Sequence, residues 1–393
     1  MSAASDRRLL MIEQGGRGGV TDYTVELLRG LAAEGWSITL ASADDHLYPS
    51  IPGVVIEPIF HYLRETSPIG RVLRRWRLGR LVNGVRFMFS VAALMRLSRR
   101  AEVVHTQGWE LLELGLVAIL GLRLAGATVI QTSHSTFDRY GRFTNARRLI
   151  REVTGRLTVA TIVHTEADLD RLPPAVRAKA LVIPHGEYGG LARTGGEADR
   201  DSSRAALGID ADVPVTLLFG QLRADKGLGD LLQALQRLPA LHLLVGGEDV
   251  GALAEVADQL QSPQLAGRTT VREGFLEMSE AAQLFAAADT VALPYPTASQ
   301  SGVLLLAYGF HRPVIVYPVG GLPESVIDGE TGWICARADV DALVGALGAS
   351  IDAGAAECRR RGEAGARLAD ERFAWPAIAH RTSDLYLDVL ARV

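Results

Sequence analysis

Residues Val291–Trp333 read VALPYPTASQSGVLLLAYGFHRPVIVYPVGGLPESVIDGETGW, and this stretch decides the fold. A short apolar strand breaks at two prolines into a small polar loop, Thr297–Ser301, and a helical run and a second apolar strand follow. A helix that begins on such a loop presents unpaired N–H groups and the positive end of its dipole. The pattern therefore fits a phosphate-binding β-α-β turn, or an ordinary turn in which Ser and Gly only cap the helix.

The composition indicates a two-domain α/β protein. A chain of 393 residues exceeds one comfortable core at roughly 150 residues per domain. A hydrophobic content of 48% and a mean hydropathy of +0.14 are typical of parallel sheets buried on both faces. Cys335 and Cys358 are too few for a disulfide framework or a zinc cluster. With no signal-peptide pattern and no uncharged run of 18 residues, we expect a cytoplasmic protein.

The amino-terminal half alternates strands and helices, as a doubly wound α/β domain does. Strand Leu9–Glu13 leads into a glycine turn and then a helix from about Asp22 to Glu34. Glycine lets a backbone approach a phosphate or a sugar closely. The turn is neither G-x-G-x-x-G nor Walker A, which counts against NAD and ATP. The candidate ligand-approach residues of this turn are Gly15, Gly16, Gly18 and Gly19.

Residues Arg64–Arg100 contain ten arginines and one acid, Glu65. A solvated face with arginine stems over apolar surface explains the stretch. An anionic membrane surface explains it as well, because RVLRRWRLGRLVNGVRFMF interleaves Arg with Leu, Trp, Val and Phe. Nucleic acid fits least, since the net charge is −4 and no nucleic-acid motif is present. The first two alternatives stay open, and we expect no nucleic-acid partner.

A second α/β unit begins after a linker rich in Gly and charge. Strand Val215–Phe219 feeds the segment GQLRADKG, and a helix from about Leu228 to Gln236 follows. Only two of the 41 basic residues are lysines, Lys179 and Lys226, so a lysine in this turn suggests a role that arginine does not fill. Two doubly wound units provide a site for a phosphate-bearing ligand and a second substrate.

The order of these motifs resembles family 4 of the retaining, nucleotide-sugar-dependent glycosyltransferases. The resemblance rests on the glycine turn, TSH at Thr132–His134, IPHG, FGQLRADKG, GGLPE with DGETG, and the closing ERFAWPAIAHRTSDLYLDVL. It implies a GT-B fold, with two doubly wound Rossmann-like domains facing across a cleft. The expected domains are 1–197 on the acceptor side, with helix 376–393 packing back on it, and 198–375 on the donor side.

The resemblance also implies the site residues. Arg223 and Lys226 would stabilise the charge of the departing diphosphate, and His134 would reach the transferred sugar. Gly16 and Gly19 would line the acceptor side. The other implied donor-binding residues are Gly220, Gly274, Phe275, Leu276, Ser299, Gln300, Ser301, Gly302 and Val303.

Three positions depart from the family pattern, and one of them is Gln221, where the family often has an arginine. The family has glutamates where this chain has Ala298 and Leu306, so Ser299, Gln300 and Ser301 would supply neutral hydrogen bonds instead. No metal or other cofactor is expected. The two D-x-D matches, at 168–170 and 210–212, are interpreted as chance acids in a helix and a linker-side turn.

The resemblance implies transfer of a sugar from a GDP-, UDP- or dTDP-sugar to a hydroxyl acceptor. With the basic stretch at 64–100, the first expectation is a lipid-linked glycan in polysaccharide or glycolipid assembly, at the inner face of the membrane. A soluble natural-product acceptor is the second. The missing glutamates leave open a non-catalytic sugar-nucleotide binder or a sugar-nucleotide epimerase.

Overall fold

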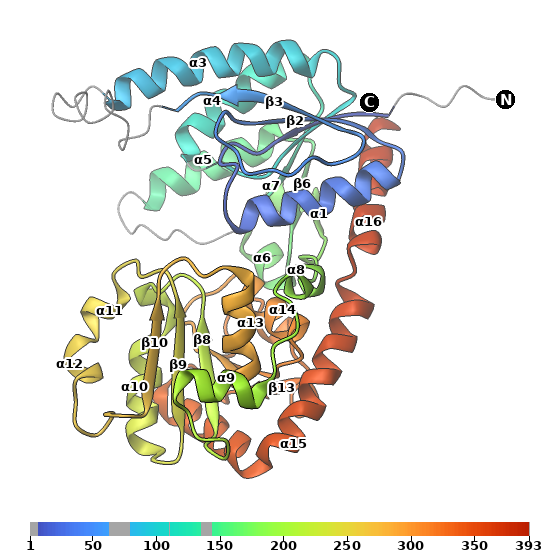
Figure 1. Ribbon diagram of the computed structural model, residues 1–393. Helices are drawn as coiled ribbons and strands as arrows, with labels where there is room; N and C mark the ends of the chain where they lie inside the picture. The colour runs from blue at the N-terminus through green and yellow to red at the C-terminus, as the bar shows by residue number, and fades with distance from the viewer. Residues whose placement is uncertain (1–6, 63–78, 110, 135–143, 393) are drawn as a thin grey trace. The chain divides into compact units, whose positions relative to one another are not determined.

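The computed structural model describes residues 7–62, 79–109, 111–134 and 144–392. It divides into two compact units, residues 1–185 with 375–393, and residues 186–374. Each unit contains one parallel sheet with helices on both faces (Figure 1), which confirms the predicted pair of doubly wound α/β units. The first unit therefore contains both the earliest and the latest described residues.

Unit 1 has a seven-stranded parallel sheet in the order β3-β2-β1-β4-β5-β6-β7. The chain order reverses between β1 and β4, so the loops after these two strands lie side by side at the carboxyl edge. The strands are β1 (Arg8–Ile12), β2 (Ser37–Ala43), β3 (Val54–Phe60), β4 (Val103–Thr106), β5 (Val129–Thr132), β6 (Ala160–Val163) and β7 (Ala180–Val182). The helices are α1 (Gly19–Ala33), α3 (Gly79–Ser98), α4 (Leu112–Leu124), α5 (Thr144–Leu157), α6 (Glu166–Arg171), α7 (Pro174–Arg177) and α16 (Trp375–Leu390).

Strand β1 supplies both hydrophobic cores of unit 1. Leu9 and Met11 pack with residues of α1 and α16, whereas Leu10 and Ile12 pack with residues of α3 and α4. This division follows from the geometry of a strand, whose successive side chains point to opposite faces of the sheet. A parallel strand buried on both faces must be apolar at every position, and the sequence LLMI satisfies that condition.

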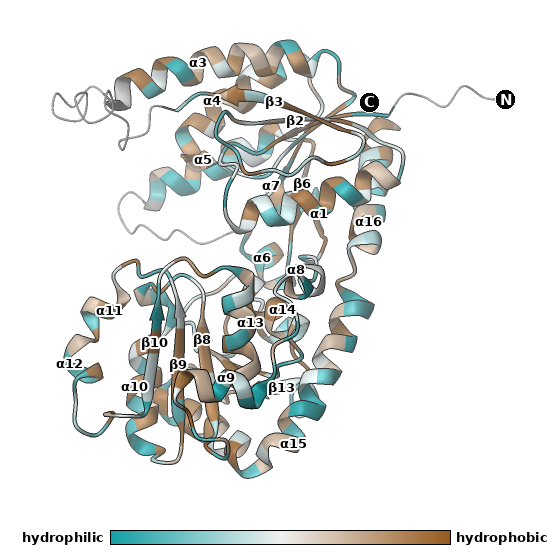
Figure 2. Ribbon diagram, viewed as in Figure 1, coloured by the Kyte–Doolittle hydropathy of each residue, from teal (hydrophilic) through white to brown (hydrophobic). Residues whose placement is uncertain are grey.

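Unit 2 has a six-stranded parallel sheet in the order β10-β9-β8-β11-β12-β13. Its order reverses between β8 and β11. Figure 2 shows the predominantly hydrophobic colouring of β8 and β9. The strands are β8 (Val215–Phe219), β9 (His242–Gly247), β10 (Thr269–Glu273), β11 (Thr290–Leu293), β12 (Val314–Val316) and β13 (Gly332–Ile334). The helices are α8 (Gly189–Thr194), α9 (Arg200–Leu207), the 3-10 turn η1 (Ala224–Lys226), α10 (Leu228–Arg237), α11 (Ala252–Glu255), α12 (Ala257–Leu260), α13 (Met278–Ala287), α14 (Gly302–Gly309), the 3-10 turn η2 (Pro323–Ser325) and α15 (Val340–Arg372), which is kinked at Gly354.

The first crossing between the units falls at Gly186, whereas the sequence placed the boundary between residues 197 and 198. The difference arises because α8 already packs against α13 and α14 of unit 2. A side chain added at Gly302 would meet the Tyr188 ring at 3.0 Å, so this contact is close. The Gly-rich composition that suggested a linker belongs instead to short helices and their caps.

Helix α16 packs against α1 (Figure 1). Gly30 makes a close approach possible, because a Cβ atom there would lie 2.4 Å from the Cβ of Ala379. The Trp36 indole donates a hydrogen bond to Ser383 Oγ at 2.9 Å. The last helix of the chain thus completes one core of the first unit.

Candidate functional site

In unit 2, the loop after β8 lies against the start of α14. Gly220 has φ +107°, and a Cβ atom there would lie 3.2 Å from a methyl group of Val303. Gly227 has φ +72°, and a Cβ atom there would lie 2.1 Å from the carbonyl oxygen of Pro294. Only glycine combines a positive φ with such an approach. These contacts bring the predicted loop and the predicted helix tip to the carboxyl edge of one sheet.

Tyr295 lies at the centre of this edge. Its ring is 2% exposed, and Lys226 Nζ lies 3.7 Å above the ring centroid. Burial raises the pKa of the Tyr295 hydroxyl and the charge of Asp225 adds to that rise, whereas the nearby Ser301 side chain and the charge of Arg223 oppose it. The hydroxyl itself makes no hydrogen bond among the described residues. A cation over an aromatic face is held in place electrostatically. The predicted Arg223, Lys226 and Ser301 therefore surround a single residue that the sequence reasoning did not single out.

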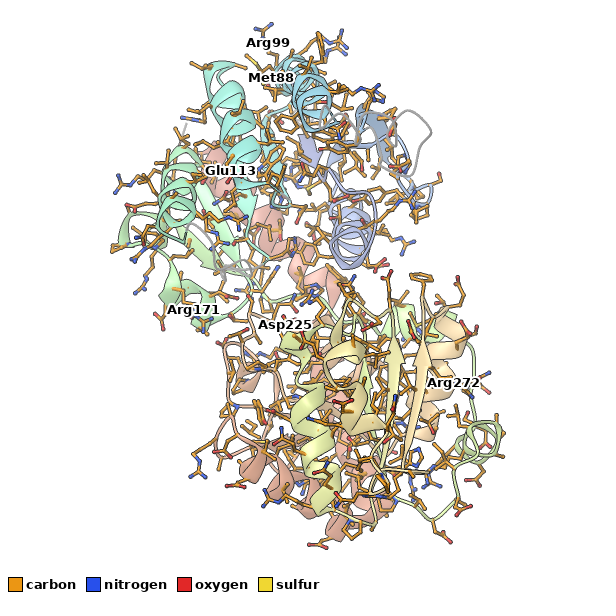
Figure 3. The ribbon with its side chains drawn as sticks, turned by 90° about the vertical axis from the view of Figure 1, so that its left-hand side faces the viewer. Met88, Arg99, Glu113, Arg171, Asp225 and Arg272 are labelled. Carbon is orange, nitrogen blue, oxygen red and sulfur yellow. The ribbon has the colours of Figure 1, made fainter. Side chains whose placement is uncertain are left out.

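Arg223 is paired with a carboxylate that the sequence reasoning also missed. Its Nε and Nη2 atoms donate to the two oxygens of Asp225 at 2.8 and 3.0 Å. Figure 3 labels Asp225 in this loop. Such a bidentate pair fixes the guanidinium plane. A diphosphate that binds Arg223 must share it with Asp225, whereas Lys226 offers a compact cation beside Tyr295.

Helix α14 has a capped amino terminus. Ser301 Oγ accepts a hydrogen bond from Leu304 N at 3.3 Å, and the side chain of Ser301 is buried. The Oε1 atom of Gln300 is buried and has no hydrogen-bond partner among the described residues. Ser299 holds the following turn, because its carbonyl oxygen accepts from Gly321 N at 2.7 Å. A buried unsatisfied oxygen next to a helix tip is the kind of group that a ligand donor completes.

The two positions without family glutamates are both buried. Ala298 and Leu306 are each 7% exposed and belong to the core of unit 2. Gly320 approaches the Ala298 carbonyl so closely that a Cβ atom there would lie 1.8 Å away. Both positions therefore contribute apolar packing behind the loop.

The predicted base-side residues follow β10. Gly274 has φ +131° and donates its N–H to the carbonyl oxygen of Gly247 at 3.0 Å. Phe275 is 82% exposed, and Leu276 packs beside Gly246 of β9. An exposed aromatic ring at this edge is a surface on which a flat base can stack.

In unit 1, three histidines follow the ends of three neighbouring strands. His134 comes after β5, His164 after β6 and His185 after β7. The carboxyl ends of parallel strands meet at one edge, so the rings come together, with centroids 5.0 Å apart for the first pair and 5.4 Å for the second. Tyr23 packs against all three rings at 4.8 to 5.3 Å.

Both ring nitrogens of His134 have partners. Nδ1 lies 3.0 Å from His164 Nε2, and Nε2 lies 2.9 Å from Gln107 Oε1. Gln107 follows β4, beside the point where the strand order reverses, and its backbone N–H donates to the Ile12 carbonyl. Any contact of a sugar with the nitrogens of His134 would have to displace or share one of these partners.

The proton positions along this series of hydrogen bonds follow from the contact between His164 and the backbone. His164 Nδ1 lies 3.0 Å from the carbonyl oxygen of Ile183 and must donate to it, which leaves Nε2 as an acceptor when the ring is neutral. His134 Nδ1 must then carry a proton and donate. Burial lowers the pKa of His134 well below its usual range, and the nearby His164 lowers it further. A neutral His134 leaves its Nε2 lone pair facing the Gln107 amide, which can rotate to present its NH₂ group.

His105 adds a second buried chain. Its nitrogens contact the hydroxyls of Tyr386 and Thr132, and burial lowers its pKa to about 3. Tyr386 belongs to α16, so these hydrogen bonds connect α16 to β4 and β5. The sequence carried a signal for the whole group, because VHT at 104–106 and again at 163–165, SHS at 133–135 and PHG at 184–186 each place His at the end of a strand, but only His134 was proposed.

The predicted glycine turn lies between β1 and α1. Gly16 has φ +64° and Gly18 has φ +81°, whereas Gly15 and Gly19 have ordinary φ values. The N–H groups of Gly15 and Gly16 donate to the carboxylate of Glu13 at 2.8 and 2.6 Å. The predicted ligand-approach loop thus has an internal anion behind it.

Among the described residues, no group of three or more His, Cys, Asp or Glu side chains is arranged to hold a metal ion. The first D-x-D match lies in α6, where the buried Asp168 accepts a hydrogen bond from Thr165, and the second lies in the turn before β8. No helix in the described part of the chain is both long and apolar enough to cross a bilayer.

Comparisons with known proteins identify the family and the fold. Residues 18–186 match the model of the glycosyl transferase 4-like domain, and residues 213–353 match the model of glycosyl transferases group 1. The chain belongs to the group 1, 4-like glycosyltransferases. Its fold is the GT-B type. A structure of Anabaena HepE, solved with UDP, superposes with a TM-score of 0.74 at 17% identity and covers 97% of this chain and 100% of that one.

Two curated relatives differ in how much of this glycosyltransferase they match. Glycogen synthase of Mycobacterium tuberculosis is 34% identical over 180 residues, which is 44% of this chain and 42% of the relative's length. D-inositol 3-phosphate glycosyltransferase of Xylanimonas cellulosilytica is 29% identical over 406 aligned residues, covering 96% of this chain and 93% of the relative.

Proposed function

We propose that this protein is a retaining glycosyltransferase that moves a sugar from a nucleoside diphosphate sugar to a hydroxyl of a lipid-linked glycan. The observation that carries the proposal is the grouping of Lys226, Arg223 and Ser301 around Tyr295 at the carboxyl edge of unit 2. Departure of a nucleoside diphosphate develops negative charge, and fixed cations with a helix tip stabilise that charge. The UDP in the Anabaena structure supports a nucleotide-bearing donor.

In the proposed reaction the acceptor hydroxyl attacks the anomeric carbon on the face that the diphosphate leaves. The bond from the sugar to the diphosphate oxygen breaks, the new glycosidic bond forms, and a diphosphate oxygen takes the hydroxyl proton. This route needs no side chain as a strong base. It also agrees with the neutral state of the buried histidines of unit 1, because burial lowers the pKa of His134 and His164. No metal is required when Lys226 and Arg223 supply the positive charge.

The donor is tested by a screen of GDP-, UDP- and dTDP-sugars. We expect one of them to raise the melting temperature, and the Lys226→Ala variant to lose that response. Transfer is then followed with the stabilising donor, and the anomeric configuration of the product is read by NMR. Inversion would reject the retaining mechanism. Binding without transfer to any acceptor would favour a non-catalytic binder, and an isomerised donor sugar would favour an epimerase.

The lipid-linked acceptor is supported by an exposed face of α3. Val85, Met88 and Phe89 are 51%, 53% and 73% exposed, and their spacing places them on one side of the helix. Figure 3 places Met88 and Arg99 on the same outer side of unit 1. Apolar side chains flanked by arginines fit the interface of an anionic membrane. Residues 64–78 of the predicted basic stretch lie outside the described residues.

Sedimentation with phosphatidylglycerol vesicles tests this surface. We expect binding at low salt that weakens at high salt, because the lipid headgroups and the arginines attract through a screened interaction. The Phe89→Ser variant should bind less, whereas Val250→Ser, at a 53% exposed valine of unit 2, should bind as the unaltered protein does. No binding at low salt would leave the soluble-acceptor alternative. That alternative is favoured by the likeness to an inositol phosphate glycosyltransferase over most of the chain.

A further inference from the structure

The glycine turn of unit 1 is built around a buried carboxylate. Glu13 follows β1 directly and is 6% exposed. Its Oε1 accepts a hydrogen bond from Gly15 N, and its Oε2 accepts from Gly16 N and from the hydroxyl of Tyr48 at 2.8 Å. Gly16 is pressed against His46, since a Cβ atom there would lie 2.7 Å from the Cβ of His46. The backbone of the turn therefore packs closely around the carboxylate of Glu13.

This arrangement changes what the turn can bind. A glycine turn before a helix ordinarily offers unpaired N–H groups to the oxygens of a phosphate. Here two of those N–H groups already serve a carboxylate, which is itself an oxygen anion. A phosphate at the same place would lose these donors and would lie beside a like charge in a poorly solvated setting.

The surrounding charges do not neutralise the negative charge of the Glu13 carboxylate. None of the residues that the structure describes forms an ion pair with it, and its partners are two amides and a hydroxyl. Asp22 places a second carboxylate in the first turn of α1, where it complements the positive end of the helix. Arg17, the basic residue of the turn, forms an ion pair with Asp45 at 3.3 Å. The electrostatic potential at the turn, on the expected acceptor side of unit 1, is thus negative.

We propose that Glu13 is a specificity-determining residue, which makes the turn reject phosphate and accept a polyol that is uncharged or carries an ammonium group. The inference rests on the proposed function and adds the chemical class of the acceptor group that meets unit 1. The uncharged hydroxyls at the growing end of a glycan belong to this class, whereas a phosphorylated cyclitol does not. This acceptor class differs from the phosphorylated acceptor for which one relative is named.

Binding is tested without any need for turnover. The full-length protein is labelled with ¹⁵N-glycine, and inorganic phosphate and D-inositol 3-phosphate are titrated in turn. In the unaltered protein the amide resonances of Gly15 and Gly16 should not move in a saturable way. In Glu13→Gln the negative charge is removed and the N–H groups of Gly15 and Gly16 are held less strongly. Their resonances should then shift in a saturable way, with a phosphate affinity at least about tenfold higher. Saturable shifts of equal affinity in both proteins would overturn the proposal, and so would the absence of any gain in the variant.

Glu102→Gln is the matched control. Glu102 Oε2 also accepts a hydrogen bond from a backbone N–H of β1, that of Arg8 at 3.1 Å, but at the opposite end of the strand. This control should titrate as the unaltered protein does. Binding of the nucleotide sugar is read separately by the melting temperature. Loss of all nucleotide-sugar binding would refute the proposed function, while the phosphate titration would still decide the role of Glu13.

In turnover assays, neutral and phosphorylated forms of one acceptor are compared at limiting concentration. The unaltered enzyme should prefer the neutral form, and Glu13→Gln should shift the ratio of the two kcat/KM values toward the phosphorylated form by about tenfold or more. An unchanged ratio would contradict the assignment.

Discussion

His164 Nε2 lies 3.0 Å from His134 Nδ1, and the opposite nitrogen of His164 lies 3.0 Å from the Ile183 carbonyl oxygen. The backbone thus determines the protonation pattern of one histidine, and that histidine determines the pattern of the next. We therefore expect His164 to position His134, the residue that the family resemblance places near the transferred sugar.

Replacing His164 by Ala should lower kcat about tenfold or more, with a smaller effect on KM. The buried donor of His134 loses its acceptor, a loss of about 1–3 kcal/mol that lets the ring reorient. His164→Gln places an oxygen near the position of Nε2 and should restore part of the activity. The control is His242→Ala, at a buried histidine bonded to Thr270 at the amino end of β9. Equal losses of activity for His164→Ala and His242→Ala would contradict a positioning role.

The buried histidines predict a stability that falls in mild acid. Burial lowers the pKa of His105, His134, His164 and His242 in the folded protein, whereas unfolded histidine titrates near 6.5. Below pH 6.5 the unfolded chain binds protons that the folded chain does not, so the free energy of unfolding decreases as pH falls. For His105 the decrease continues toward its folded pKa of about 3.

Urea unfolding at pH 7.5, 6.5 and 5.5 measures this decrease. Each histidine contributes at most about 1.4 kcal/mol per pH unit in that window. The His105→Asn variant should show a shallower dependence over the same range, because one titrating group is removed. A free energy of unfolding that stays constant or increases from pH 7.5 to 5.5 would refute the linkage.

Lys226→Ala should reduce turnover by about 10²-fold or more, the scale of a lost oxyanion partner. Lys226→Arg should recover only part of it, because the planar fork does not fit the position of Nζ above the Tyr295 ring. Arg237→Ala removes an equal charge from an exposed pair with Asp341 and serves as the control. Near-normal turnover of Lys226→Ala would remove the lysine from the proposed site.

Gly227→Ala should destabilise unit 2 and abolish donor binding. The added Cβ would lie 2.1 Å from the Pro294 carbonyl oxygen, so the loop after β8 must move away from β11. Gly267→Ala is a close control, since Gly267 has φ +74° against +72° for Gly227 but has no atom within 4 Å of an added Cβ. The control should show only the left-handed strain, about 1–2 kcal/mol.

Chemical unfolding and nucleotide-sugar binding are measured for both glycine variants. A similar loss of stability in both would mean that the conformation, rather than the approach to Pro294, requires glycine at position 227.

The sequence predicted the fold better than the site. Apolar strands such as Val215–Phe219 appear directly in the pattern, because strands buried on both faces must be continuously apolar. Short elements were harder, and β13 at Gly332–Ile334 was not predicted. The unit boundary at Gly186 was not predicted, because glycine-rich composition does not distinguish a linker from a short packed helix such as α8.

The partners of the predicted site residues depend on contacts between distant positions. Nothing local in the sequence indicates that Tyr295 supports Lys226, or that Tyr48 and two glycine amides meet on Glu13. Ion pairs over two residues, such as Arg223 with Asp225, are visible in the sequence only once the turn geometry is known. The sequence pattern therefore identifies the strands and helices that carry a site. The packing of distant residues determines which charged groups of that site can still bind a ligand.

Helix α16 belongs to unit 1 although the whole of unit 2 precedes it in the chain. Its Trp375 and Tyr386 fill the core beside Tyr23 and His105. On the ribosome, residues 186–374 have emerged and can fold before that core receives its last helix. The core of unit 1 is thus completed only when α16 arrives, and until then its exposed apolar surface favours aggregation.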